Sequence, residues 1–278
     1  MQPLEPGLHV VATPIGNLRD ITLRALDVLA AADAVLAEDT RMTRRLLDAH
    51  GVRARVERYD DHVDEGARAG VLARLQAGAA LALVSDAGTP LVSDPGFKLV
   101  RAAAAAGVRV LPRPGPSAAR AALVAAGLPP DRFLFAGFAP AKAGARRTWL
   151  AGLAGVDATL VLYETGPRLA ASLADMADVL GDRPAAVTRE LTKLFEEVRR
   201  GGLADLSAHY GAAGGPKGEI VVVVGAPQEV AAAPDLDGAL RTALAGHSVK
   251  DAAALVAAAT GAPKREVYQR ALALSKGG

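Results

Sequence analysis

Short apolar runs alternate with amphipathic stretches along the first half of the chain, and each run ends in turn residues. The runs are short enough for buried strands, and the stretches between them carry apolar residues at helical spacing. The expected strands cover residues 8–12, 34–37, 52–56, 80–84 and 108–111. The expected helices follow a cap at Asp20 or Thr22, run from Thr40 to His50, from 64 to 77, from a cap at Asp94 to about Gly107, and from 117 to 126. This alternation predicts an α/β domain with a largely parallel sheet over residues 1–126.

A Gly-Leu-Pro-Pro linker at 127–130 precedes a second set of alternating elements. Strands are expected at 133–138, 159–163, 185–189 and 219–225, with helices at 143–153, 168–180 and 203–210. They predict a second α/β domain over residues 131–226.

Three further helical stretches follow a linker at 227–234, and they predict a helical C-terminal extension over residues 235–278. They cover residues 236–245, 249–259 and 264–274, with Ser248 and Pro263 at helix starts. A short Gly turn before a helix that carries Lys264 and Arg265 is typical of a helix-turn-helix. A helical cap that packs on the second domain or on a dimer partner fits the spacing equally well.

Three loops at strand carboxyl ends, 13–17, 85–96 and 112–117, are rich in Gly and Pro. Ligands of open α/β sheets bind beyond these ends, so the loops are expected to meet at one site. The loop 85–96 contains Asp86 and Asp94 and neither Lys nor Arg, whereas a phosphate cradle needs donors and positive charge. A cationic or hydroxyl- and amine-rich ligand such as S-adenosylmethionine fits better. Asp94 can cap the following helix, and this explains its position as well as ligand binding does.

Composition narrows the function classes. The net charge is only +2 although the isoelectric point is about 9.0, so a nucleic-acid surface must be a local basic patch. Cys is absent, which excludes disulfides, thiolate metal sites and cysteine nucleophiles. No apolar run approaches the roughly 20 residues of a membrane span, and the chain is expected to be soluble and cytoplasmic. The five His residues show no ligand spacing, and no metal is expected.

The motifs TPIGNLRDIT, AEDTRMT and LVSDAGTPLVSDPG resemble one family, and PGPSA, GLPPDRFLFAGFAPAK, LYETGPRL, TRELTKLFEE and KGEIVVVV extend the match in order along the chain. The family is ribosomal RNA small-subunit methyltransferase I, within the tetrapyrrole methylase superfamily. The resemblance implies two α/β domains of the tetrapyrrole methylase type, a helix-turn-helix-like extension, and a cytoplasmic homodimer with S-adenosylmethionine between the domains. It also implies methylation of a cytidine ribose 2′-oxygen in the decoding region of 16S rRNA.

Site residues are carried over by position in the loops and strand ends. The candidate cofactor-binding residues are Pro14, Gly16, Asp86, Ala87, Gly88, Ser117, Ala118, Tyr163 and Ile220. Removal of the 2′-proton needs a base, and the candidate catalytic groups are Glu38, Asp39 and Lys193, with Glu164, Glu190 and Glu197 as further acids. Lys193 could serve as base only with a lowered pKa. Asp39 can equally cap a helix, and residues 190–197 can equally form a solvated helix with Lys193 and Glu197 paired.

RNA contacts are expected from local basic groups rather than aromatic stacking, because aromatic residues are only 4% of the chain. The candidates are Arg41, Arg44, Lys142, Arg146, Arg147, Lys264 and Arg265. Two other functions fit the same scaffold: methylation of a tetrapyrrole-like small molecule, and a non-catalytic RNA-binding module.

Overall fold

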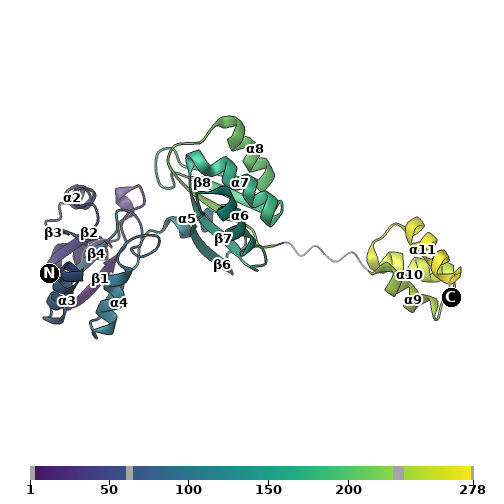
Figure 1. The fold of residues 1–278 in the computed structure, drawn as a ribbon, viewed down its shortest axis with the longest axis horizontal. Helices are drawn as coiled ribbons and strands as arrows, with labels where there is room; N and C mark the ends of the chain where they lie inside the picture. The colour runs from purple at the N-terminus through teal and green to yellow at the C-terminus, as the bar shows by residue number, and fades with distance from the viewer. Residues whose placement is uncertain (1–3, 61–64, 228–234, 277–278) are drawn as a thin grey trace. The chain divides into compact units, whose positions relative to one another are not determined.

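The computed structural model describes residues 4–60, 65–227 and 235–276. The chain divides into two compact units, Met1–Pro227 and Gln228–Gly278. The first contains two five-stranded sheets and the second contains three helices (Figure 1). Residue 64, the expected start of the third helix, and the linker residues 228–234 lie outside the described residues.

The first sheet is entirely parallel, with the strand order β3-β2-β4-β1-β5. Its strands are β1 (Gly7–Val11), β2 (Ala34–Ala37), β3 (Val56–Arg58), β4 (Ala80–Val84) and β5 (Val110–Arg113). The predicted parallel sheet is confirmed. The third strand is shorter and later than expected, because Val52 and Ala54 pack into the core as part of the connection after the helix Thr40–Ala49.

Helices cover both faces of this sheet, so its central strands β2, β4 and β1 are buried along their whole length and are apolar except for His9. Alternate strand residues such as Val11 and Val35 pack against α1 (Leu23–Ala31) and α2 (Thr40–Ala49). The intervening ones, such as Leu8 and Leu36, pack against α3 (Glu65–Gln76) and α4 (Phe97–Ala105). A 3-10 turn, η1 (Leu18–Asp20), precedes α1. Because helices cover both faces of the sheet, a ligand can reach it only at the loops beyond the strand ends.

The start of α4 differs from the prediction. Gly96 occupies the N-cap with a φ of 116°, and no side chain caps the helix. The assignment of Asp94 as a cap is therefore wrong, because the left-handed glycine directs the chain into the helix two residues later. By contrast, Thr22 caps α1 as one of the two expected residues, since its hydroxyl accepts a hydrogen bond from the Ala25 amide.

The second sheet is mixed, with the order β6-β7-β10-β8-β9. Its strands are β6 (Phe133–Phe138), β7 (Thr159–Thr165), β8 (Pro184–Arg189), β9 (Glu197–Gly202) and β10 (Glu219–Val224). Only β6 and β7 pair in parallel. The helical alternative for residues 190–197 is wrong: a loop leads into edge strand β9, where Glu197 pairs with Arg189 of β8 at 3.1 Å.

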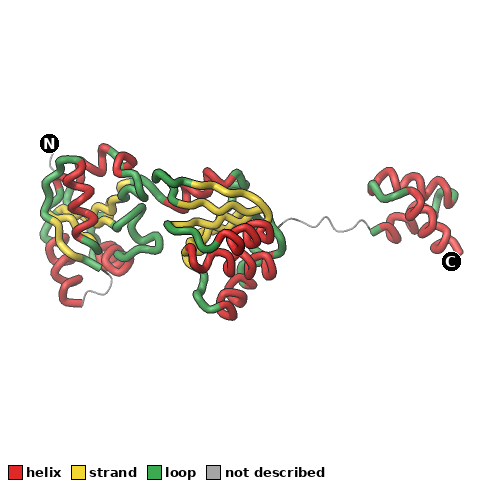
Figure 2. The backbone as a smooth tube through the Cα atoms, turned by 90° about the horizontal axis from the view of Figure 1, so that it is seen from above, coloured by secondary structure: helices red, strands yellow, loops and turns green. Residues whose placement is uncertain are grey.

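Three helices cover one face of the second sheet: α6 (Ala143–Ala151), α7 (Gly166–Leu180) and α8 (Leu203–Ala213). The other face is covered by α5 (Ala118–Ala126), whose Ala122 and Leu123 pack with Val161 and Val221. Figure 2 shows the strands of this sheet side by side with the helices beside them. Helix α5, expected as the last element of the N-terminal domain, thus packs on the second sheet.

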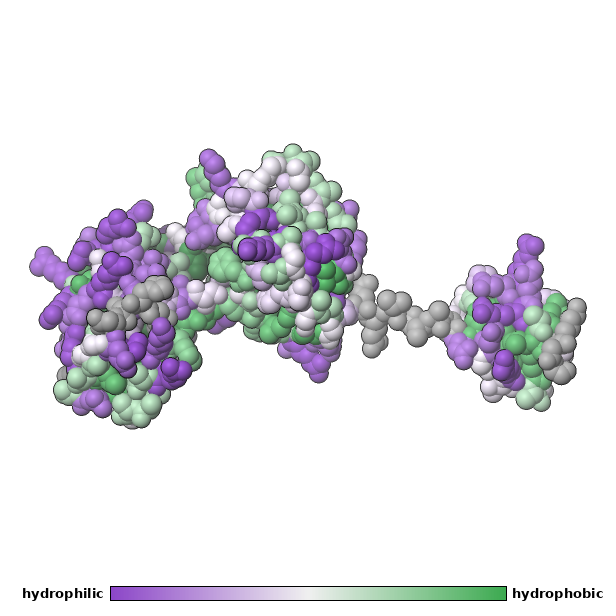
Figure 3. All heavy atoms as spheres, in the orientation of Figure 1, coloured by the Kyte–Doolittle hydropathy of each residue, from purple (hydrophilic) through white to green (hydrophobic). Residues whose placement is uncertain are grey.

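The second unit is a small helical domain with its own core. It contains α9 (Leu236–Leu244), α10 (Val249–Thr260) and α11 (Lys264–Lys276), which pack through Leu240, Val256 and Val267. Ser248 caps α10 as expected. Figure 3 shows mixed hydrophilic and hydrophobic side chains on its visible surface. Within the described residues, no helix is both long and apolar enough to cross a bilayer.

Candidate functional site

The loops that follow β1, β4 and β5 are hydrogen-bonded to one another, as the sequence predicted. Thr13 and Gly88 exchange two backbone hydrogen bonds, at 2.8 and 3.1 Å. The Thr13 hydroxyl also donates to the Ser85 carbonyl at 3.1 Å, and the Thr89 hydroxyl donates to the Pro116 carbonyl at 3.0 Å. The loops therefore form one connected surface at the carboxyl edge of the first sheet.

Backbone strain is concentrated in two loops of this region. Four non-glycine residues of the described chain have positive φ: Leu91 and Ser93 in the loop after β4, and Glu190 and Thr192 in the loop after β8. Such conformations persist only where surrounding contacts hold them, and they cluster at ligand sites. The loop after β8 also reaches the first sheet, since the Asn17 amide donates to the Thr192 hydroxyl at 3.2 Å.

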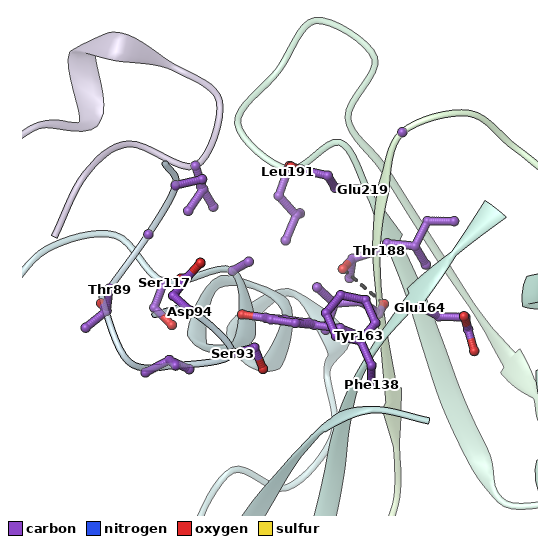
Figure 4. A pocket seen from close by; sticks show the side chains of 18 of the residues that line it. Thr89, Ser93, Asp94, Ser117, Phe138, Tyr163, Glu164, Thr188, Leu191 and Glu219 are labelled. Carbon is purple, nitrogen blue, oxygen red and sulfur yellow. Dashed lines mark hydrogen bonds between the residues drawn. The ribbon is translucent and has the colours of Figure 1, made fainter. Parts of the chain in front are cut away.

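A cavity of about 280 Å³ lies between these loops and the second sheet. Six of its lining residues are predicted cofactor-binding residues: Ala87, Gly88, Ser117, Ala118, Tyr163 and Ile220. Tyr163 extends toward Asp94 and Ser117 (Figure 4). Its ring also packs edge-on against Phe138, with the centroids 5.4 Å apart. The described residues that line this first cavity include no Lys, Arg or His.

A second cavity of about 320 Å³ adjoins the first. Both cavities are lined by Ile15, Ala87 and Glu219, which form a shared wall. The other three predicted cofactor-binding residues, Pro14, Gly16 and Asp86, line the second cavity rather than the first, together with Arg45, Lys193 and Met42. Of the nine predicted cofactor-binding residues, six therefore line the first cavity and three line the second, with Ala87 lining both.

Lys193 is held as an ammonium ion. Its Nζ donates to Glu190 at 2.8 Å and to Glu219 at 3.0 Å. Partial burial lowers the pKa of Lys193, but these two carboxylates outweigh burial and raise it above its usual value. Its stem crosses Gly16 so closely that a Cβ there would lie 2.5 Å from the lysine Cγ. The expected use of Lys193 as a base with a lowered pKa is therefore wrong.

Asp39 and Glu38 occupy different environments although they are neighbours. Asp39 is the N-cap of α2 and pairs with Arg41 at 2.7 Å. The hydrogen bonds from the Arg41 side chain and amide hold the pKa of Asp39 far below its usual value, so it is a very weak base. The Asp39 amide donates to the Asp86 carboxylate at 3.1 Å. Glu38 is exposed and lines neither of the two cavities.

The further acids of the second sheet have structural partners. The buried Glu164 carboxylate accepts hydrogen bonds from Ser172 at 2.5 Å and from the Thr165 amide at 2.8 Å, and it pairs with Arg168. Glu190 accepts from Lys193 and from the Glu219 amide. The Lys193 hydrogen bond is the main reason that the pKa of Glu190 is lowered.

Asp94 is the acid that sequence reasoning misplaced. It lines the first cavity, and burial raises the pKa of its carboxyl to about 6, with the neighbouring Glu38 and Asp86 adding to the shift. Phe138, Thr188 and Leu191 also line this cavity and were not predicted. The sequence offered one indication that Phe138 lies at the site. It is the last residue of a predicted strand, as Tyr163 is of the next one.

One of the predicted RNA-binding residues is internal. Arg146 is only 4% exposed, donates to the Pro140 and Ala141 carbonyls, and pairs with Asp175 at 2.6 Å. The prediction that it contacts RNA is therefore wrong, because Arg146 lies on the buried face of α6 together with Leu150. Arg147 is half-exposed and pairs with Asp175 and Asp178. Besides Arg147, the exposed candidates are Arg41, Arg44, Lys142, Lys264 and Arg265.

Comparison with known proteins matches both units. Residues 7–207 match the family of Tetrapyrrole (Corrin/Porphyrin) Methylases, and residues 230–275 match the RsmI C-terminal HTH domain. A ribosomal RNA small subunit methyltransferase I from Mesorhizobium japonicum is 54% identical over 275 residues, covering 98% of this chain and 94% of the relative. The protein of the same name from Erythrobacter litoralis is 55% identical over 276 residues, covering 98% and 97%.

Among solved structures, the fold is similar to that of uroporphyrin-III C-methyl transferase from Thermus thermophilus complexed with S-adenyl homocysteine. The TM-score is 0.53 at 20% identity, covering 78% of this chain and 96% of that one. Such a likeness identifies the fold, and the near full-length relatives identify the function at the level of the family. The chain belongs to the ribosomal RNA small subunit methyltransferase I family, within the tetrapyrrole methylases.

Proposed function

We propose that the protein methylates the ribose 2′-hydroxyl of a cytidine in the decoding region of 16S rRNA, with S-adenosylmethionine as methyl donor. The observation that carries the proposal is the pair of cavities with a shared wall at Ile15, Ala87 and Glu219. A methyl donor and an acceptor need separate sites that bring the reacting atoms into contact. The family membership supports rRNA as the acceptor.

The first cavity fits S-adenosylmethionine in its chemistry. The cofactor is cationic at sulfur, and this cavity contains carboxylates and no basic side chain among its described lining residues. Backbone from Ala87 to Gly88 and at Ser117 and Ala118 would hold the cofactor, beside the side chains of Tyr163 and Ile220. The related fold solved with S-adenyl homocysteine supports the same choice. When bound, S-adenosylmethionine supplies a methyl group on a sulfonium that an oxygen nucleophile can displace.

The second cavity fits a ribose with its phosphate. Arg45 and Lys193 supply positive charge, and Met42 and Leu18 supply apolar contact. Pro14, Gly16 and Asp86 complete the wall of this cavity. In this reading the Lys193 ammonium orients the acceptor by donating hydrogen bonds and does not take the 2′-proton. Of the three expected catalytic groups, Asp39 caps α2 and Lys193 is charged, so Glu38 is left as the candidate base.

RNA outside the cavities would lie on exposed basic groups of both units. Arg41 and Arg44 are on α2, next to the second cavity, and Lys142 precedes α6. Lys264 and Arg265 are in the first turn of α11, the place at which a helix-turn-helix presents its recognition helix. The expected homodimer and cytoplasmic location stay predictions that follow from the family. Light scattering of the purified protein measures the first of them.

The test is methyl incorporation into small ribosomal subunits from a strain that lacks this enzyme, followed by mapping of the labelled nucleotide. We expect label on the 2′-oxygen of one decoding-region cytidine. Label on a base atom, on another nucleotide, or on a tetrapyrrole instead of the subunit would contradict the proposal. Binding of S-adenosylmethionine by the purified protein, measured separately by calorimetry, tests the choice of donor.

A further inference from the structure

We propose that the Asp94 carboxylate recognises the positive sulfur of the methyl donor, and so distinguishes the charged cofactor from its neutral product. This inference rests on the proposed function, because it assigns a role within the proposed cofactor cavity. It gives Asp94 a part in specificity that neither the family relationship nor the loop motif assigns.

The first observation is a charge imbalance in the first cavity. Three carboxylates line it, those of Asp94, Glu164 and Glu219, and no cationic side chain of the described residues does. Glu164 is satisfied by Ser172, Arg168 and the Thr165 amide. Glu219 is paired with Lys193 at 3.0 Å. Asp94 alone of the three has no hydrogen bond or ion pair within the described chain.

The second observation is the surroundings of Asp94. It is partly buried on the loop between β4 and α4, and in Figure 4 it lies beside Ser117 with Tyr163 extending toward it. The charges that act on it are negative: Glu38 and Asp86 raise the pKa of Asp94, and Asp94 in turn raises that of Tyr163 after burial. A carboxylate in such a place is destabilised until a cation arrives. It also lines the first cavity and not the second, so it faces the donor rather than the acceptor.

The charge of the ligand changes during the reaction. A carbon–oxygen bond forms to the ribose, the carbon–sulfur bond breaks, and its electron pair stays on sulfur, which becomes a neutral thioether. The proton of the ribose hydroxyl leaves to a base or to water. The ammonium and carboxylate of the methionyl portion keep their charges. A contact between Asp94 and sulfur therefore weakens on transfer, whereas a contact between Asp94 and the ammonium does not.

This difference makes the experiment specific. Calorimetry at pH 8 measures the affinity of the full-length protein for S-adenosylmethionine and for S-adenosylhomocysteine. We expect Asp94→Asn to weaken binding of S-adenosylmethionine about tenfold, as loss of a partly buried charge contact does. We expect its affinity for S-adenosylhomocysteine to change less than about twofold. The matched control is Asp131→Asn, the same chemical change at an exposed aspartate that lines neither of the two cavities, and the ratio of the two affinities should stay within about twofold of wild type.

Equal weakening of both ligands by Asp94→Asn would overturn the inference, because Asp94 would then contact the ammonium or only shape the cavity. Unchanged binding of S-adenosylmethionine would overturn it too. A wild-type protein that binds neither ligand would refute the proposed donor itself, so the two failures are distinguishable. Folding of the variant is checked by thermal unfolding without ligand. The melting temperature should rise at pH 8, because the raised pKa of Asp94 shows that its charged form opposes folding there.

Discussion

The two cavities share the wall formed by Ile15, Ala87 and Glu219, yet their charges differ. The first has an uncompensated carboxylate, Asp94, and no basic group among its described lining residues. The second has Arg45 and Lys193. Glu219 belongs to both, and its carboxylate is paired with Lys193 at 3.0 Å. The second cavity also contains the carboxylates of Asp86 and Glu219, so the difference between the cavities is that basic side chains line only the second among the described residues.

The comparison also shows how the separation is maintained. The first cavity lies between loops of both sheets, and the second lies largely on the first sheet with α2. The loop after β8 crosses between them and places the Lys193 stem over Gly16. Lys193, from the loop that follows a strand of the second sheet, therefore supplies positive charge to the second cavity. Its stem fills the space beside Gly16, where a Cβ would clash.

Removal of the Lys193 charge should have the largest effect. We expect Lys193→Met to lower kcat/KM for the small subunit by about 10²–10³-fold, the usual consequence of losing one oriented donor at a reacting oxygen. The affinity for S-adenosylmethionine should change less than about threefold, because Lys193 does not line the first cavity. Single-turnover methylation and calorimetry measure the two quantities.

Methionine is chosen because it keeps an unbranched apolar stem across Gly16. Lys193→Ala then reports the additional effect of losing that packing. If Lys193→Met retained full activity, the ammonium would have no part in acceptor binding. The proposal that the second cavity binds the acceptor through Lys193 would then be contradicted.

The pH dependence of donor binding should be the next largest effect. The pKa of Asp94 is raised to about 6 by burial, Glu38 and Asp86. The carboxylate is therefore present above pH 6 and lost below it, so the affinity for S-adenosylmethionine should be constant above about pH 7. It should fall as the pH drops below 6 and approach the roughly tenfold weaker value expected for Asp94→Asn, because protonation removes the same charge. Calorimetry from pH 5 to 8 should show this fall in the wild type and a flat profile in Asp94→Asn.

A backbone change should separate cavity shape from stability. Gly88 has a φ of 81° and lines the first cavity, and Gly107 has a φ of 72° after α4 with open space around it. An L-residue in this conformation costs about 1–2 kcal/mol, so both Gly88→Ala and Gly107→Ala should lower the melting temperature by about 2–8 °C. Only Gly88→Ala should weaken S-adenosylmethionine binding, by about tenfold. Equal ligand binding by the two variants would mean that Gly88 serves the fold alone.

The smallest expected effect is at the entrance of the second cavity. Arg45→Ala should raise the KM for small subunits several-fold and reduce the slope of log affinity against log salt by about 1, as loss of one phosphate contact does. Donor affinity should not change. Arg24→Ala removes an exposed arginine of α1 that lines neither of the two cavities, and its effect should be smaller. If both variants changed the salt dependence of binding equally, the effect would come from the overall positive charge of the protein and not from a local contact of Arg45.

The sequence predicted the strands and the loops that meet at the site, because apolar runs and Gly/Pro punctuation are local signals. It did not predict contacts made by residues distant in sequence. Lys193 was considered as a base since Glu219, 26 residues away, pairs with it only in the folded sheet. Arg146 was placed on the surface since its partner Asp175 lies on another helix.

The charge pattern of residues 190–197 also led to a wrong helical alternative just before an edge strand. Residues 190–197 have charges at helical spacing, but Glu190 and Thr192 adopt positive φ and end any helix there. Strand β9 follows, partly exposed and charged as edge strands are, and so lacks the apolar alternation that identifies a buried strand. Asp94 precedes the actual N-cap, Gly96, by two residues, and the sequence alone does not show that the left-handed Gly96 starts the helix.

Helix α5 has a consequence for the construction of chimeras between related enzymes. It follows the first sheet in sequence, yet its Ala122 and Leu123 cover Val161 and Val221 of the second sheet. A chimera joined at residue 126 would combine a foreign α5 with a resident sheet and mismatch that packing. A junction after Arg113, at the end of β5, keeps α5 with its sheet, but it then divides the cofactor cavity between parents just before Ser117 and Ala118. Exchange of either half should therefore alter donor affinity even when every cavity residue is identical.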